Sequence, residues 1–381
     1  MKNKIKIIDL FAGAGGSSLG YEMSDMEVVC AVEYDRSAAN TYRLNHKNTV
    51  LLEEDIRHLA DVNYFLPYRG KVEGIVMSPP CQGMSLAGNR DVNDSRNTLF
   101  MDAMKIVRDV EPLFFVMENV PGLLSMKTKD GNKIIDLIEQ ETKTSGYKTT
   151  YKILNSADYG VPQIRKRFIM IGFRNDLDLD LESAFPKICV DSSNYISVWE
   201  AISDLPDVKP CGGECVQKYT KNPTNDYQIL MRGNNQDLYN HISMKHTKRM
   251  IERFEHIKAG QSVSDVAKEY GQRKRGDVSI VSGKSYKQNN YRVYGNAPMP
   301  TIPAGCQSNF IHPYENRNFT PREIARLMSF PDNYIITGNR THMSWDKTLC
   351  QYEQLGNAVP PLLAKSIGMS IVKEINKVLV E

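Results

Sequence analysis

The chain has 381 residues, enough for one large or two moderate domains, and its 41% hydrophobic and 24% charged residues are ordinary for a folded protein. The net charge of only +3 excludes a polycation, so any nucleic-acid surface must be a local patch. No apolar run approaches the length of a membrane span, and seven scattered cysteines indicate a reducing, cytoplasmic compartment rather than a disulfide framework.

The first half of the chain alternates short apolar runs with amphipathic stretches. A helix is predicted over 97–110, and buried strands are predicted over 4–11, 28–33, 73–78, 113–119 and 167–173. This alternation favours parallel βαβ units, and hence an α/β, Rossmann-like doubly wound sheet. Ligands bind at the carboxyl ends of the strands in such sheets, so the residues just after each run are candidates for chemistry.

A glycine-rich loop, DLFAGAGG, follows the first strand at residues 9–16. Its glycines allow a tight turn, and the helix expected from about Ser17 directs N–H groups toward an anion. Glu33 ends the second strand and can bind both hydroxyls of a ribose, while Asp55 follows a further short apolar run, VLL at 50–52, and can reach an adenine amine. Because the loop lacks the GxGxxG pattern, S-adenosylmethionine, a dinucleotide and a purely structural turn all stay open on these residues alone.

A second loop, SPPCQG at residues 78–83, begins where the strand predicted over 73–78 ends. Its two prolines stiffen the backbone, so the loop can hold Cys81 out as a nucleophile. The alternative, a buried structural cysteine, fits poorly beside Pro-Pro and Gln-Gly. Carbon 5 of a pyrimidine becomes nucleophilic only after a thiolate adds to C6, whereas enzymes that methylate exocyclic amines carry an aromatic residue after Pro-Pro. The cysteine therefore favours methylation of carbon.

Glu118 lies at the end of the strand predicted over 113–119, and Arg165 and Arg167 lie in the segment QIRKR. A glutamic acid can donate to N3 of the base and so assist attack on C6. In an extended segment the two arginines share one face, so one can bind the cytosine O2 and orient Glu118 while the other braces the loop. Taken singly, Glu118 can also be a solvated glutamate, and the arginines can belong to a basic surface turn.

From about residue 186 the periodicity fades, which predicts a second, smaller and irregular domain. Residues 241–292 hold twelve Lys/Arg against five Asp/Glu, with tyrosines between them; charge alone leaves a solvated surface and a nucleic-acid surface equally open. A helix is predicted over 320–330, with Thr320 as its cap and Glu323 at the capping-box spacing, and another over 362–380. We see no metal-ligand cluster and expect no metal.

Together these motifs resemble the DNA cytosine-5 methyltransferase family of the bacterial restriction–modification type, in the family's order over most of the chain. The resemblance implies S-adenosylmethionine as cofactor and S-adenosylhomocysteine as product. It implies cofactor contacts from Phe11, Ala12, Gly13, Gly15, Gly16, Glu33, Asp55, Ile56, Pro80, Leu99, Asn357 and Val359. It implies catalysis by Cys81, Glu118 and Arg167, supported by Arg165, and DNA contacts from Gln82, Ser85 and Thr301.

The resemblance also implies a catalytic and cofactor-binding domain over 1–185, a target-recognition domain over 186–344, and a segment over 345–381 that returns to the catalytic domain. The partner is double-stranded DNA, with the target cytosine flipped out of the duplex, and the basic segment 241–292 is then better explained as a DNA-facing surface. We expect a monomer with no membrane contact and no stable protein partner; a restriction endonuclease would be a genetic partner only.

Three alternatives compete with this interpretation. A branch of the family methylates tRNA, but its characteristic Cys-Phe-Thr-Lys-Gly-Tyr segment is absent from the sequence. A catalytically idle DNA-binding subunit would not need Cys81, Glu118 and both arginines together. A nicotinamide oxidoreductase would explain the glycine-rich loop and Glu33, but it gives Pro-Pro-Cys-Gln no role.

Overall fold

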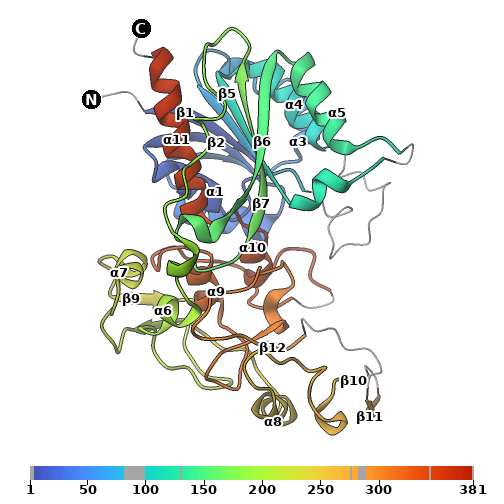
Figure 1. The fold of residues 1–381 in the computed structure, drawn as a ribbon, viewed down its shortest axis with the longest axis vertical. Helices are drawn as coiled ribbons and strands as arrows, with labels where there is room; N and C mark the ends of the chain where they lie inside the picture. Colours follow the sequence, from blue (N-terminus) through green and yellow to red (C-terminus); the bar gives the residue numbers. More distant parts are fainter. Residues whose placement is uncertain are drawn as a thin grey trace. The chain divides into compact units, whose positions relative to one another are not determined.

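The computed structural model describes residues 4–80, 99–128, 131–274, 277–281, 289–342 and 345–379 (Figure 1). The chain forms two compact units: the first holds Met1–Tyr159, Lys166–Cys189 and Val359–Glu381, and the second holds Gly160–Arg165 and Val190–Ala358. This division differs from the expected domains mainly at 160–165 and 345–358, which both belong to the second unit. These two segments are joined to each other, because Arg165 donates hydrogen bonds to the carbonyl oxygens of Gly356 and Ala358.

A seven-stranded sheet forms the centre of the first unit, in the order β3-β2-β1-β4-β5-β7-β6. The strands are β1 (Ile5–Leu10), β2 (Met26–Val32), β3 (Val50–Leu52), β4 (Gly74–Met77), β5 (Phe114–Asn119), β6 (Tyr147–Asn155) and β7 (Lys166–Arg174). Strands β1 to β5 run parallel, which confirms the predicted Rossmann-like α/β class, whereas β7 is antiparallel to both β5 and β6. Strand β6 was not predicted, because most of its side chains are only half-buried and no apolar run marks it.

Helices cover both faces of this sheet (Figure 1). The helices are α1 (Gly16–Glu22), α2 (Arg36–Asn45), α3 (Ile56–Asp61), α4 (Leu99–Val110), α5 (Ile134–Thr144) and α11 (Pro361–Leu379). Helices α3, α4 and α5 share one core cluster with the sheet, and α1 and α11 share another on the opposite face. At Gly20 of α1 the contact with α11 is so close that a Cβ atom would lie 2.3 Å from the carbonyl oxygen of Pro361.

The second unit contains short elements joined by long irregular segments. They are α6 (Val198–Ile202), β8 (Val216–Lys218), α7 (Asp226–Arg232), β9 (Asp237–Tyr239), α8 (Lys248–His256), β10 (Arg273–Lys274), β11 (Asp277–Val281), β12 (Tyr291–Arg292), β13 (Phe310–Ile311), α9 (Pro321–Leu327) and α10 (Gln351–Asn357). Helix α9 begins as predicted: Thr320 accepts from the Glu323 N–H, and the Glu323 carboxylate accepts from the Thr320 N–H at 2.7 Å.

Buried ion pairs centred on α9 hold the second unit together. The Arg326 guanidinium donates to both carboxylate oxygens of Asp204, at 2.9 and 3.1 Å, and to both of Asp332, at 2.7 Å each. Arg317 forms a second bidentate pair with Glu323, at 2.7 and 2.8 Å. Because all these side chains are almost fully excluded from solvent, removing one partner would leave an uncompensated charge, which costs about 3–5 kcal/mol.

Two further findings concern the described residues as a whole. None of their helices combines the length and apolar character that crossing a lipid bilayer requires. The six cysteines among them, namely Cys30, Cys189, Cys211, Cys215, Cys306 and Cys350, are all free thiols.

Candidate active site

The glycine-rich loop leaves β1 in an unusual backbone conformation. Phe11 has a φ of 64°, in the left-handed region that a bulky residue rarely adopts, and Gly13 has a φ of 56°. A Cβ atom built on Gly13 would meet no other atom within 4 Å, so space is open next to the backbone there. Ala12 is buried beneath the loop, and Gly15 and Gly16 begin α1. The loop thus combines local strain with open space, a combination common at binding sites.

Glu33 fixes this loop from the end of β2. One carboxylate oxygen accepts from the Gly13 N–H at 2.8 Å, and the other accepts from the Asp35 N–H at 2.6 Å. Burial raises the pKa of Glu33, and the two N–H donors oppose that rise only in part. The next residue, Tyr34, is 74% exposed, so a flat aromatic ring stands open beside the acid. Tyr34 was not predicted as a site residue, although an aromatic residue directly after the acid was a readable signal.

Asp9, at the end of β1, is a buried acid that was not predicted as a site residue either. Its Oδ2 accepts a hydrogen bond of 2.6 Å from the Ser18 hydroxyl, which lies 2.8 Å from the Tyr42 hydroxyl. Among the described residues, Oδ1 of Asp9 has no hydrogen-bond partner. Burial raises the pKa of Asp9 to about 7, and the nearby carboxylate of Glu33 adds to the rise.

Asp55 and Ile56 lie where β3 leads into α3. The Asp55 carboxylate caps α3 by accepting from the Arg57 N–H at 3.0 Å, and the Arg57 side chain holds the pKa of that carboxyl below its usual range. Ile56 is buried in the core, as is Leu99, the first residue of α4. Both apolar residues therefore belong to the core that supports this edge of the sheet.

Glu118 and Arg167 come from neighbouring antiparallel strands. Glu118 lies near the end of β5 and Arg167 near the start of β7, and the Arg167 Nε lies 2.8 Å from the Glu118 Oε1. The two side chains are 17% and 11% exposed. Burial lowers the pKa of Arg167, and the charge of Glu118 opposes this. Arg167 also donates to the Lys166 carbonyl oxygen at 2.8 Å, so the pair is fixed from both sides.

Asn119, next to Glu118, connects this pair to the Pro-Pro segment. Its side-chain amide donates to the Pro79 carbonyl oxygen at 3.2 Å, and its Oδ1 accepts from the Val120 N–H at 2.8 Å. Asn119 is buried, and Pro80 is half-buried. The predicted nucleophile Cys81, with Gln82 and Ser85, lies outside the described residues.

Arg165 differs from Arg167 in its surroundings. It belongs to the second unit, is 1% exposed, and donates to the carbonyl oxygens of Ile302, Gly356 and Ala358. These contacts suit a side chain that braces loops. Thr301, predicted to contact DNA, is exposed and donates to the Ile164 carbonyl oxygen at 2.7 Å.

Asn357 and Val359 come from the last predicted motif. Asn357 is the exposed final residue of α10 in the second unit. Val359 is 7% exposed and packs in the core of the first unit. The chain thus passes from one unit to the other within this motif.

The basic segment 241–292 is less uniformly a surface than its charge suggests. Arg253 and Arg292 are buried and bind backbone carbonyls, including those of Gly271 and Phe254. Arg275, Lys284 and Lys287 lie outside the described residues. The exposed bases are Lys245, Lys248, Arg249, Lys258, Lys268 and Lys274. At least two of the twelve bases therefore support the fold and do not face solvent.

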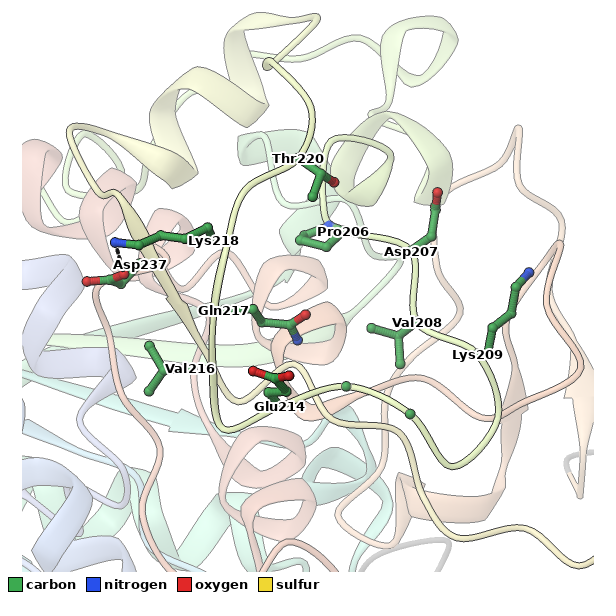
Figure 2. Close-up of a pocket in the computed structure, with 12 residues that line it drawn as sticks. Pro206, Asp207, Val208, Lys209, Glu214, Val216, Gln217, Lys218, Thr220 and Asp237 are labelled. Atoms are coloured by element: carbon green, nitrogen blue, oxygen red, sulfur yellow. Dashed lines mark ion pairs between the residues drawn. The ribbon is translucent and has the colours of Figure 1, made fainter.

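A hollow of about 890 Å³ lies in the second unit, around β8 and the segment before it (Figure 2). Its charged residues are largely paired, since Lys218 contacts Asp237, Lys209 bonds to Glu315 and Asp207 bonds to Lys221. None of the residues predicted as catalytic or cofactor-binding lines it. We therefore do not place the active site there.

Comparisons with known proteins agree on one family. The sequence pattern of the C-5 cytosine-specific DNA methylases matches residues 5–373. The Type II methyltransferase M.DdeI of Desulfomicrobium norvegicum is 49% identical over 367 residues, which cover 96% of this chain and 88% of that protein. The Type II methyltransferase M1.HphI of Haemophilus parahaemolyticus is 32% identical over 371 residues, covering 96% and 86%.

A solved structure agrees with these relatives. It is described as a DNA modification methyltransferase encoded within an Escherichia coli prophage; it is 27% identical and has a TM-score of 0.75 over 98% of this chain and 100% of that one. The mostly parallel sheet is thus a Rossmann-like α/β fold shared with a methyltransferase. The chain belongs to the C-5 cytosine-specific DNA methylase family and is a DNA cytosine-5 methyltransferase.

Proposed function

We propose that this enzyme methylates carbon 5 of a flipped-out cytosine within a short recognition sequence of double-stranded DNA. The methyl donor is S-adenosylmethionine, and Cys81 is the covalent nucleophile. The observation that carries the proposal is the Glu118–Arg167 pair. Glu118 lies on β5, which pairs with β4, and Pro79 and Pro80 after β4 lead into Cys81.

The loop residues fit an adenosyl cofactor. The open space at Gly13 accommodates close approach of a ligand to the backbone, and Glu33 offers a carboxylate to ribose hydroxyls beside the exposed ring of Tyr34. Phe11, Asp55 and Leu99 complete the set of described residues that we assign around it. When bound, S-adenosylmethionine supplies an electrophilic methyl group on a sulfonium.

The remaining chemistry belongs to the side chains of this chain. The Cys81 thiolate adds to C6 of the cytosine and makes C5 nucleophilic. Arg167 holds Oε1 of Glu118, so we assign Oε2 to the hydrogen bond with N3 of the base, where electron density accumulates during the attack. Arg167 also has donors for the cytosine O2. Methyl transfer to C5, loss of the C5 proton and departure of Cys81 complete the turnover.

Positioning residues support these groups. Asn119 holds the carbonyl of Pro79, two residues before Cys81 in the sequence, and so fixes the described residue from which that segment continues. Arg165 braces the loops of the second unit through three backbone carbonyls. We assign target recognition to the second unit, which has the irregular segments that base-edge contacts require.

The relatives support a biological setting. M.DdeI and M1.HphI are both Type II methyltransferases, so we assign this enzyme to a restriction–modification system in the cytoplasm. Its partner is double-stranded DNA, and we infer a monomer that needs no endonuclease to act.

The test is base-resolution sequencing of cytosine methylation in DNA from a methylation-free bacterial host that expresses this chain, with Cys81→Ser as the matched control. We expect 5-methylcytosine confined to one short motif and absent in the control. Unmodified DNA from folded wild-type protein, or normal methylation by Cys81→Ser, would contradict the proposal. In the first case, tRNA from the same cells is the next substrate to examine.

A further inference from the structure

Asp9 is a buried acid to which the proposed reaction assigns no role. It lies at the end of β1, directly before the loop that carries Phe11 and Gly13, and it is 1% exposed. Oδ2 receives the Ser18 hydroxyl, and Oδ1 receives no hydrogen bond from any described residue. A carboxylate with one donor and no cation is poorly stabilised in such a place.

Apart from the Ser18 hydroxyl, which stabilises the charged form, the titratable groups around Asp9 make a negative charge there still less favourable. From α1 it faces Ser18, Tyr21 and Glu22, and from α2 it faces Tyr42. Beyond the end of β2 stands Glu33, whose carboxylate adds to the rise in the pKa of Asp9.

Glu118 and His46 are the remaining titratable residues to consider around Asp9. Strand β4, next to β1, carries no titratable residue, and β5 beyond it carries Glu118, which together with Asp9 raises the pKa of Tyr21. His46, directly after α2, lies 3.1 Å from Glu22 and so contacts a different carboxylate. No described basic side chain bonds to Asp9, and a cationic ligand at the adjacent loop would supply a positive charge there.

We propose that Asp9 loses its proton when the positively charged methyl donor binds at the adjacent loop, and regains it when the donor becomes the uncharged product. Asp9 would thereby favour the sulfonium over the thioether. The inference rests on the proposed use of S-adenosylmethionine. The step is a proton transfer from the Asp9 carboxyl to solvent on binding, and from solvent back to Asp9 after the sulfonium has given up its methyl group.

The measurement is isothermal titration calorimetry of S-adenosylmethionine and S-adenosylhomocysteine binding, each in two buffers of different ionisation enthalpy. The buffer dependence of the heat counts the protons released. At pH 7 Asp9 is about half protonated, so we expect S-adenosylmethionine to release up to about half a proton more from the wild type than from Asp9→Asn. Protons exchanged by the amino group of the ligand contribute equally in both proteins, so they cancel in the difference between wild type and Asp9→Asn. For S-adenosylhomocysteine we expect no difference between the two proteins.

Two further variants make the test specific. Ser18→Ala keeps the acid but removes the hydrogen bond that stabilises its charged form, so proton release should extend to higher pH and exceed that of the wild type at pH 8. His46→Gln removes a histidine that contacts Glu22, another neighbour of Asp9, and should release as many protons as the wild type.

The outcomes separate this inference from the proposed function. Equal proton release by the wild type and Asp9→Asn, or release that disappears in His46→Gln, would overturn the role of Asp9 while leaving cofactor use intact. Folded wild-type protein that binds neither ligand would overturn the assignment of the cofactor and, with it, this inference. If Asp9→Asn fails to fold, the Ser18→Ala variant decides the question. Proton release by Ser18→Ala equal to that of the wild type at pH 8 would overturn the role of Asp9.

Discussion

Asp9→Asn should change how the stability of the ligand-free first unit depends on pH. The carboxyl has a pKa of about 7 in the folded state against 3.8 without burial, so between these values the folded state holds a proton that the unfolded state has lost. Stability therefore falls as pH rises through this window, by about 1.4 kcal/mol per pH unit. Asparagine does not ionise, so the variant is spared this loss.

The structure sets the magnitude of the effect. A pKa difference of about three units corresponds to about 4 kcal/mol at pH 8 and above, and Asp9 is too buried for solvent to screen it. Between pH 5 and pH 8 the part that develops is about 2.5 kcal/mol. Asparagine places an amide where the acid has its hydroxyl. This adds to the difference in unfolding free energy between variant and wild type an amount that does not change with pH. The change in the stability difference with pH is therefore the diagnostic quantity.

The assay must report on the first unit. Trp199 and Trp345 are the two tryptophans of the chain and both lie in the second unit, so fluorescence would follow the other unit. Hydrogen exchange of β1 and β4 amides in a urea series, at pH values from 5 to 8, follows the sheet itself. We expect Asp9→Asn to gain about 2.5 kcal/mol on the wild type across that range. A stability difference that stays flat with pH would refute the protonation of Asp9.

Substitutions of four arginines test the catalytic pair, the buried ion pairs of the second unit and the basic segment 241–292. Arg167→Ala removes the partner of Glu118, so covalent complex formation with 5-fluorocytosine DNA should slow at least about 100-fold while cofactor affinity stays within about twofold; unchanged trapping would exclude a role for the pair. Arg326→Ala removes the cation that binds the buried carboxylate of Asp204 and leaves Asp332 with only Arg322 and Tyr219, so tryptophan fluorescence should show the second unit losing about 3–5 kcal/mol of stability in urea. Arg249→Ala, on an exposed position of α8, should lower the salt slope of DNA binding by about one, whereas Arg253→Ala should lower thermal stability instead; equal behaviour of the two variants would contradict their different burial.

The sequence predicted those features that depend on residues close together in the chain. Apolar runs located β1, β2, β4, β5 and β7, and the spacing of Thr320 and Glu323 predicted the capping box of α9. Because parallel strands place their carboxyl ends at one edge of a sheet, the residues that follow each apolar run could be selected as site candidates from the sequence alone. These patterns need only periodicity and a few chemical rules.

Other features depend on partners far away in the sequence. Arg165 bonds to the carbonyl of Gly356, 191 residues further on, and no local pattern indicates such a contact. Arg253 and Arg292 carry the same charge as their exposed neighbours, so composition alone could not show that both bind buried carbonyls. The isolation of Asp9 likewise follows from the packing of two helices over β1, which its sequence neighbours do not reveal.

The packing of α11 against α1 has a consequence for biosynthesis. A ribosome makes β1 to β7 first, then residues 190–358 of the second unit, and only afterwards the helix that covers α1 and contributes Leu363 and Ile367 to the core beneath it. Until α11 emerges, the apolar face of α1 and this face of the sheet lack that cover, and Gly20 lacks its contact with Pro361. The glycine-rich loop that precedes α1 therefore gains its support last, so a nascent chain would not acquire cofactor affinity until translation has passed α11.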